Sequence, residues 1–351
     1  MQTKTLFQPG EGGYSAFRIP SIIALPSGRI LAFCEGRMHG LQDWGTIHIV
    51  MKYSDDNGRT FSPLSLVTQN GEHTIGNPCP VYDRDTKLLH LLLNGNRADG
   101  GEALILKGQA PRTVLHVQSA DEGRTWSSLQ DISRETRKAN WTWYAIGPCH
   151  GIQLRSGRLL LACNHAVQQP EKECSGPYTA HCIYSDDHGK SWQIGEDVAE
   201  NTNECALAQL QDGRIYINMR SYHGKSCRAV AYSSDEGLSW QDFRLDRALP
   251  DPICQGSVLF CEVLWNRKHM LLCSNVPQTQ ERRNLAIHIS EDSGQTWTRS
   301  LLLHEGPAAY SDMAQQSQHT LLCIYECGAE QPYEEIRLAF IEASDFEKNE
   351  L

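Results

Sequence analysis

One eight-residue motif occurs five times in this chain and limits what it can fold into. Each copy reads Ser-x-Asp-x-Gly-x-Ser/Thr-Trp/Phe, at residues 54–61, 119–126, 185–192, 233–240 and 290–297. The Asp side chain can accept hydrogen bonds from backbone N–H groups across a turn, and the Gly supplies a positive φ. We expect the aromatic residue to pack the turn against its own sheet. Five copies indicate architecture, so we do not assign their aspartates to catalysis.

A segment typical of a β-strand precedes each copy of the motif, at residues 45–53, 112–118, 179–184, 227–232 and 284–289. The motif aspartates are about fifty to sixty-five residues apart, the size of one four-stranded propeller blade. Dividing the chain by this period gives about six blades, one of them without the motif. Only residues 131–140 and 345–351 suggest helices. The sequence therefore predicts one all-β domain over residues 1–351, a six-bladed β-propeller.

Composition excludes several classes of function. The formal net charge of −10 argues against nucleic acid or an anionic membrane as a partner. No apolar run approaches the ~18 residues of a membrane span. The N-terminal residues lack the apolar segment of a signal peptide. We therefore expect a cytoplasmic protein, or a secreted or periplasmic one if a leader was removed.

The 13 cysteines are scattered through strand-like segments, without a CxxC pair. This pattern favours buried, reduced thiols over disulfides and makes a zinc site improbable. Cys174, His181 and Cys182 lie close in sequence, but a loop followed by a strand explains them better. No metal or organic cofactor is predicted.

A single arginine interrupts the apolar segment YSAFRIPSII, residues 14–23. Arg18 should be drawn inward with Phe17 and Ile19, and burying a guanidinium is costly unless an anion meets it. The segment therefore predicts that Arg18 binds an anion.

The five motifs together with the FRIP sequence resemble the exo-α-sialidases of the bacterial and animal type, in which the turn motif is called the Asp-box. The similarity runs from Tyr14 to about Glu326. Other matching segments are GNPCPVYD (76–83), NWTWYAIGPCHGIQL (140–154), CQGSV (254–258), SNVPQTQERRNL (274–285) and YSDM (310–313). The resemblance implies an enzyme that removes a terminal sialic acid, a nine-carbon sugar whose anomeric carbon bears a carboxylate.

That carboxylate is the anion which the resemblance implies for Arg18. In the family three arginines clamp it, and the matching positions here are Arg18, Arg220 and Arg282. Guanidinium groups offer the planar paired donors that a carboxylate accepts. Arg283 competes with Arg282 for the third position, but the family pattern of Arg-x-Asn/Asp-Leu favours Arg282.

The resemblance also implies catalytic roles. Tyr310 matches the nucleophile and Glu204 its proton acceptor, because a neutral phenol avoids the repulsion between a carboxylate nucleophile and the anionic sugar. Asp43 matches the general acid/base, and Arg37 lies beside it near the C4 side of the sugar. Glu326 matches the carboxylate that orients Arg18. Three further residues fall in segments that often line the family's pocket, although core packing is the better assignment for each: Trp143, Tyr144 and His165.

The sequence therefore predicts a retaining exo-α-sialidase acting on glycoproteins, glycolipids or oligosaccharides through a tyrosyl-glycosyl intermediate. One alternative is a trans-sialidase, although those enzymes typically carry lectin-like domains for which this chain has no room. Another is a non-catalytic sialic-acid-binding propeller, which would need the arginines but not Asp43, Glu204 and Tyr310 together. A third is a relative that prefers the deaminated nine-carbon acid.

Overall fold

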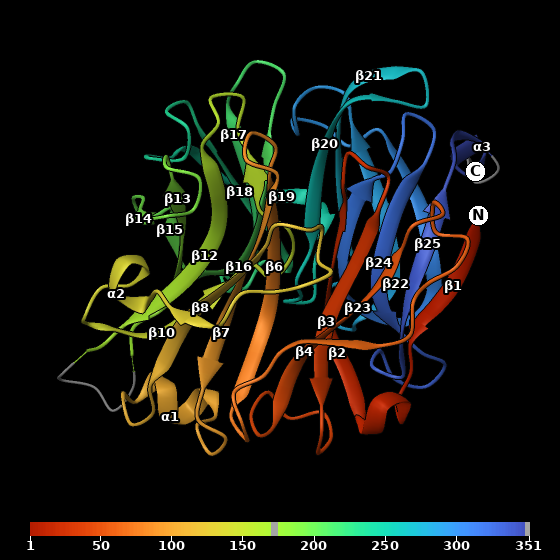
Figure 1. Ribbon diagram of the computed structural model, residues 1–351. Helices are drawn as coiled ribbons and strands as arrows, with labels where there is room; N and C mark the ends of the chain where they lie inside the picture. Colours follow the sequence, from red (N-terminus) through yellow and green to blue (C-terminus); the bar gives the residue numbers. More distant parts are fainter. Residues whose placement is uncertain (170–174, 348–351) are drawn as a thin grey trace.

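The computed structural model describes residues 1–169 and 175–347, and β-strands dominate it (Figure 1). The all-β prediction is confirmed. The helices of the described residues are short: η1 (Glu11–Gly13), α1 (Glu102–Leu106), α2 (Ser133–Thr136) and α3 (Ala343–Glu347). Two of them, α2 and α3, lie where the sequence suggested helices, while residues 348–351 lie outside the described part. No pattern in the sequence predicted α1.

The strands of the described residues form four sheets, not six separate ones. The first sheet contains eight strands: β2 (Ala16–Ala24), β3 (Ile30–Arg37), β4 (Ile47–Ser54), β5 (Ser65–Thr68), β6 (Thr74–Asp83), β7 (Leu88–Asn96), β8 (Arg112–Ser119) and β9 (Gln130–Asp131). Within it, β4 meets β6 through a parallel pairing of Ile47 with Thr74. This sheet is therefore two antiparallel runs, β2–β5 and β6–β9, joined at one point.

The middle of the chain forms two more sheets. One contains β10 (Trp141–Ile146), β11 (Ile152–Gln153), β12 (Leu159–Val167), β13 (Tyr178–Ser185), β14 (Gln193–Ile194) and β15 (Ala199–Glu200). The other contains β16 (Thr202–Gln209), β17 (Ile215–Ser221), β18 (Cys227–Ser233) and β19 (Gln241–Pro250).

The last sheet joins the two ends of the chain. It contains β20 (Ser257–Leu264), β21 (Arg267–Asn275), β22 (Arg283–Ser290), β23 (Arg299–Gln315), β24 (Leu321–Cys327), β25 (Glu335–Ile341) and β1 (Gln2–Phe7). The long strand β23 pairs with β22 through its first half and with β24 through its second. β1 pairs antiparallel with β25, so the first and last strands of the described residues lie side by side (Figure 1).

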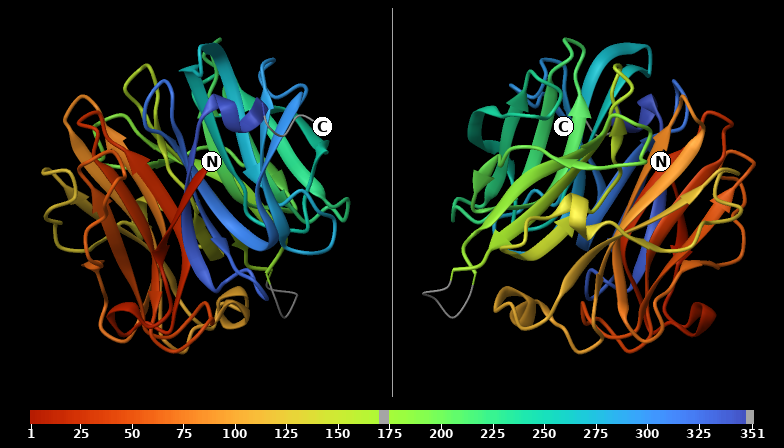
Figure 2. Two further views of the ribbon diagram at one scale, coloured as in Figure 1. Left: turned by 90° about the vertical axis from the view of Figure 1, so that its right-hand side faces the viewer. Right: turned by 60° about the vertical axis from the view of Figure 1, so that its left-hand side comes forward.

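Strands of successive runs contact one another in a closed ring. β2 contacts β6, β6 contacts β10 and β12, β12 contacts β16, β16 contacts β20, β20 contacts β23, and β23 contacts β2 again. The turned views in Figure 2 show the sheets standing side by side around the molecule, with the first and last parts of the chain adjacent. All five strands predicted before the motifs are present, as β4, β8, β13, β18 and β22.

The motif turns are held by the hydrogen bonds that the sequence predicts. In the third copy, the amide N–H of Ser191 donates to Asp187 over 2.9 Å, and its hydroxyl donates to the other carboxylate oxygen over 2.6 Å. Ser185 donates to Asp187 and accepts from the Gly189 amide, both over 2.8 Å. The other four copies repeat this network. Each turn is therefore a self-contained polar unit.

The prediction that each turn packs against its own sheet is incomplete. The aromatic side chains also reach the preceding run of strands. For example, the ring of Trp126, after β8, lies edge to face with the ring of Phe33 in β3, with the ring centroids 5.9 Å apart. The motif glycines, all at positive φ, approach that same preceding run. Their neighbours are Phe340 for Gly58, Leu31 for Gly123, His90 for Gly189, Leu160 for Gly237 and Tyr216 for Gly294. Glycine is therefore needed at this position for two reasons: it adopts the positive φ, and it lets the turn approach the preceding run of strands closely.

The expectation for the cysteines is confirmed for the described residues. The cysteines in residues 1–169 and 175–347 are free and buried, and burial raises the pKa of thiols such as Cys163, to about 12. Cys174 lies outside the described residues. In that same part of the chain, no helix has the length and apolar character to cross a bilayer.

Two glycines allow the stability cost of steric overpacking to be separated from the cost of backbone strain. Gly294 and Gly213 have similar positive φ values, 81° and 90°. A Cβ on Gly294 would lie 2.8 Å from the Tyr216 ring, whereas a Cβ on Gly213 meets no atom within 4 Å. Gly213→Ala should cost about 1 kcal/mol of unfolding free energy from strain alone. Gly294→Ala should cost about 2–4 kcal/mol, because overpacking adds to the strain. Urea denaturation of both variants measures the difference, and equal losses would contradict the packing argument.

Candidate active site

One cavity of about 250 Å³ collects the residues that the sequence singled out. It is lined by Arg18, Arg37, Asp43, Glu204, Arg220, Arg282 and Tyr310. These side chains come from distant parts of the chain: β2, β3, the loop after β3, β16, β17, the segment before β22, and β23. Glu326 of β24 is fully buried and hydrogen-bonded to Arg18. The ring of strands thus brings all eight predicted residues to one place.

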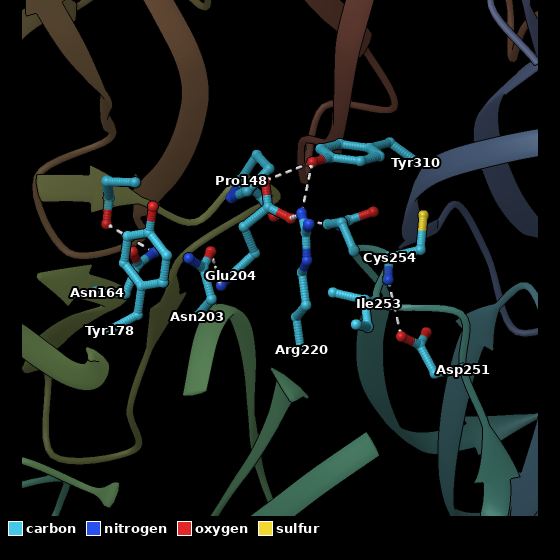
Figure 3. Close-up of polar contacts among 12 residues, drawn as sticks. Pro148, Asn164, Tyr178, Asn203, Glu204, Arg220, Asp251, Ile253, Cys254 and Tyr310 are labelled. Carbon is cyan, nitrogen blue, oxygen red and sulfur yellow. Dashed lines mark hydrogen bonds and ion pairs between the residues drawn. The ribbon is translucent and has the colours of Figure 1, made fainter. Parts of the chain in front are cut away.

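A tyrosine, a glutamate and an arginine form the tightest polar group in the cavity (Figure 3). The Tyr310 hydroxyl donates to Glu204 over 2.6 Å. Arg220 donates from Nη1 to the other Glu204 oxygen over 2.8 Å and to the Tyr310 hydroxyl over 3.2 Å. Burial and the Glu204 charge raise the pKa of Tyr310, against the opposing effect of Arg220 and Arg282. The phenol is therefore protonated, and its proton already points at a carboxylate.

Glu326 orients Arg18 from behind the cavity. Arg18 donates to its two carboxylate oxygens, from Nε over 2.7 Å and from Nη2 over 3.2 Å. The backbone N–H groups of Ile19 and Tyr310 also donate to Glu326, over 2.7 and 3.2 Å. Burial lowers the pKa of Arg18, but the Glu326 charge outweighs it and the net direction is upward. One buried carboxylate thus positions both the FRIP arginine and the backbone of Tyr310.

Of the two adjacent arginines at the start of β22, Arg282 faces the cavity. It donates to the Tyr333 hydroxyl over 2.9 Å and to the Ile253 carbonyl over 3.1 Å. The Tyr333 ring also lies 3.9 Å from the Arg18 guanidinium. Arg283 instead pairs with Glu281 over 3.4 Å, with a side chain 48% exposed. The geometry therefore supports Arg282 as the third clamp arginine.

Arg37 lies between two carboxylates on the other side of the cavity. It donates from Nη2 to Glu35 over 2.6 Å and to Asp43 over 2.7 Å. The Asp43 side chain is 68% exposed, whereas that of Glu35 is buried. Desolvation raises the pKa of Asp43, but the charges of Arg37 and Arg18 outweigh it, so the pKa lies below its ordinary value. Asp43 is therefore a carboxylate at the mouth of the cavity, ionised before substrate binds.

Known proteins resemble this chain over nearly its whole length. The family described as BNR repeat-like domain matches residues 65–323. Sialidase-2 of Mus musculus is 32% identical, covering 96% of this chain and 94% of its own length. This chain belongs to the sialidase family. An exo-alpha-sialidase of Aspergillus fumigatus is 33% identical over 80% of the chain and 69% of its own length. The solved Hadza microbial sialidase Hz136 superposes with a TM-score of 0.89 at 26% identity, covering 98% of this chain and 69% of its own.

The sialidase cavity also contains residues that the sequence did not reveal. Glu35 stands two positions before Arg37 on one strand, so the alternation of β3 could have placed both on one face. Arg112 lies on β8 in a segment without any recognisable motif, and Tyr333 lies in a turn after β24. These residues come together only through the ring of strands, which no local pattern specifies.

The preferred assignment to core packing is confirmed for Tyr144 and His165 and is wrong for Trp143. Trp143 lines the cavity, but Tyr144 and His165 are buried away from it. The Tyr144 hydroxyl donates to Cys163 over 3.2 Å, and the His165 ring stacks on Trp141 with centroids 3.7 Å apart. Alternation along β10 explains why Trp143 and Tyr144 differ, because neighbouring residues of a strand point to opposite faces.

One group of described residues in this sialidase offers ligand atoms close enough for a metal ion: Asp83, Asp85 and His188. None of the three lines the cavity. Both Asp83 oxygens already accept hydrogen bonds, from Gln153 over 2.8 Å and from Thr86 over 2.6 Å. The group therefore has no part in the chemistry of the cavity.

The adjacent arginines give a matched test of the clamp. Arg282→Lys should weaken binding of an unsaturated sialic acid analogue by about tenfold or more, because an ammonium cannot replace a paired fork of donors. Arg283→Lys, one residue away on the surface, should leave affinity unchanged. Isothermal titration calorimetry measures both, and an equal effect in the two variants would contradict the assignment of Arg282.

Proposed function

We propose that this sialidase hydrolyses terminal α-linked sialic acid from glycoproteins, glycolipids or oligosaccharides with retention, through a covalent intermediate on Tyr310. The single observation that carries the proposal is the 2.6 Å hydrogen bond from the Tyr310 hydroxyl to Glu204 inside a cavity lined by three arginines. A nucleophile and its base within hydrogen-bond reach are the signature of nucleophilic catalysis.

We also infer that the strands form a six-bladed β-propeller with the active site near its axis. The closed ring of contacts from β2 to β23 supports this reading. So do the antiparallel runs of four strands, with β23 shared between the last two. β1 would complete the last blade by pairing with β25. A propeller accounts for the convergence of residues from every part of the chain.

In the first step, the substrate carboxylate binds Arg18, Arg220 and Arg282. The Tyr310 oxygen forms a bond to the anomeric carbon while its proton passes to Glu204. The bond from that carbon to the leaving oxygen breaks, and Asp43 supplies the proton that this oxygen needs. In the second step Asp43 takes a proton from water, the water oxygen replaces the tyrosyl oxygen, and Glu204 returns its proton to Tyr310.

The environment of Asp43 suits an acid that takes up its proton from solvent when the substrate binds. The cations of Arg37 and Arg18 keep its pKa low in the free enzyme. The bound sialic acid brings a carboxylate that offsets the charge of Arg18, and a nearby negative charge raises the pKa of an acid. Its exposed position at the mouth of the cavity also leaves room for a leaving group and then for water.

Two substitutions separate the proposed roles. Tyr310→Phe should lose at least about a hundredfold in kcat while still binding a sialic acid analogue, since the arginines remain. Asp43→Asn should lose activity on natural sialosides but retain most of it on aryl sialosides, whose leaving groups need little protonation. Release of sialic acid and of fluorophore measures both. Near-normal turnover by Tyr310→Phe, or equal losses by Asp43→Asn on the two substrate classes, would contradict these roles.

A preference for the deaminated nine-carbon acid is the second candidate, and Arg112 favours it. Arg112 donates from Nη1 to Asn96 over 2.8 Å and from Nε to the Tyr144 carbonyl over 2.9 Å. Among the described residues its Nη2 group has no hydrogen-bond partner and no carboxylate pairs with it. Burial lowers its pKa to about 10, against the opposing charge of Glu35. Arg112 therefore presents N–H donors to the cavity, and no acceptor among the described residues pairs with them.

The position of Arg112 relates these donors to the sugar ring. It is bonded to β10, which stands across the ring of strands from β23 and Tyr310. The C5 substituent of sialic acid lies across the pyranose from the anomeric carbon that Tyr310 would attack. A C5 hydroxyl can accept a hydrogen bond from the guanidinium of Arg112. The N–H of an N-acyl group is itself a donor and cannot accept that hydrogen bond.

The ratio of kcat/KM for aryl glycosides of the deaminated and N-acetyl acids tests the role of Arg112. We expect the wild-type enzyme to favour the deaminated acid, and Arg112→Met to shift the ratio toward the N-acetyl form by about tenfold, because one charge-assisted hydrogen bond is lost. An unchanged ratio in the variant would show that Arg112 does not contact the C5 substituent.

A further inference from the structure

Apolar side chains lie exposed beside the catalytic cavity. Trp44, the residue after Asp43, is 47% exposed, and Leu104 of α1 is 38% exposed. Both line a second, shallow cavity of about 570 Å³ whose walls are formed by Trp44 and α1. Tryptophan is usually well buried, so an indole left half in water at the rim of an active site marks a contact surface.

The structure holds the indole in a fixed place. The Trp44 ring packs over Gly101, the residue before α1, and a Cβ on Gly101 would lie only 3.2 Å from Cε3 of the ring. The glycine therefore lets the indole lie close against the backbone. An aromatic ring that packs on the protein through one face presents its other face as a rigid surface for a ligand. Because the ring is already fixed, little side-chain entropy is lost when a ligand binds.

The two cavities are neighbours that share one lining residue. Glu102 lines both of them, and its carboxylate accepts a hydrogen bond from the Tyr178 hydroxyl. Asp43 and Trp44 are consecutive in the loop between β3 and β4, so the proposed acid lies between the sialic acid cavity and the indole. A group that leaves on the side of Asp43 would therefore leave next to Trp44.

We propose that Trp44 and α1 form the binding site for the leaving group, and that this group is a neutral pyranose. This inference rests on the proposed function, because it needs Asp43 on the leaving-group side. A pyranose has an apolar C–H face that packs on an indole and a rim of hydroxyls that donate to carboxylates such as Glu102. The leaving sugar thus binds the platform while its glycosidic oxygen faces Asp43.

Two substrates that both need the proton of Asp43 test the proposal. Sialyllactose, as its α2-3 and α2-6 isomers, carries a pyranose leaving group, whereas methyl α-sialoside carries only methanol. Trp44→Ala should lower kcat/KM for sialyllactose by about tenfold, the order expected for one lost aromatic contact, and change methyl sialoside less than twofold. Trp44→Phe should retain most of the activity on sialyllactose.

A second variant keeps the indole and displaces it. Gly101→Val places a branched side chain against the ring and should reproduce the selective loss on sialyllactose. Leu302→Ala removes an exposed apolar residue of β23 (47% exposed) and should change neither substrate, which makes it the matched control.

The outcomes are distinct. Equal losses on both substrates in Trp44→Ala would mean that Trp44 acts only by positioning Asp43, and unchanged activity on both would mean that it makes no contact with the sugar. Either result overturns this inference. Failure of the wild-type enzyme to release the sialic acid from either substrate, in both its N-acetyl and its deaminated form, would overturn the proposed function instead.

Discussion

The contact between each Asp-box turn and the preceding run of strands is the constraint on which the rest of this molecule depends. A run of four strands cannot bury both its faces alone, and the glycine of each turn lets the next run approach it closely. Gly58 extends the series to the seam between the ends of the chain, because its neighbour is Phe340 of β25. The turns therefore fix the spacing between runs, and with it the size of the cavity that the runs line.

The cavity is built from charges that hold one another in place. Glu326 has no exposed surface and accepts hydrogen bonds from Arg18 and from the backbone of Ile19 and Tyr310. Glu35 does the same for Arg37. The substrate then meets guanidinium groups that are already oriented, so little side-chain entropy is lost on binding. An acidic protein can bind an acidic sugar in this way, because the positive field is confined to one place.

How much the sequence could predict depends on how far apart in the chain the interacting residues are. The turns and their preceding strands are local, so the repeat specified them, and β4, β8, β13, β18 and β22 all appear where the motif predicts. Arg18 could be recognised as a buried cation in need of an anion. Arg112 and Tyr333 could not be found, because their role depends on which strands meet across the ring. The packing of each turn on the preceding run was missed for the same reason.

The pairing of β1 with β25 joins residues more than three hundred positions apart, as where Gln2 meets Phe340. Such a closure is slow to form, because the whole intervening chain must be ordered before its first and last strands can meet. Until then β25 is an edge strand with unpaired backbone groups, open to any strand of compatible sequence. The first strand of a second copy has that sequence. Crowded nascent chains of this protein are therefore at risk of exchanging their β1 strands, linking two molecules by the same hydrogen bonds that close one.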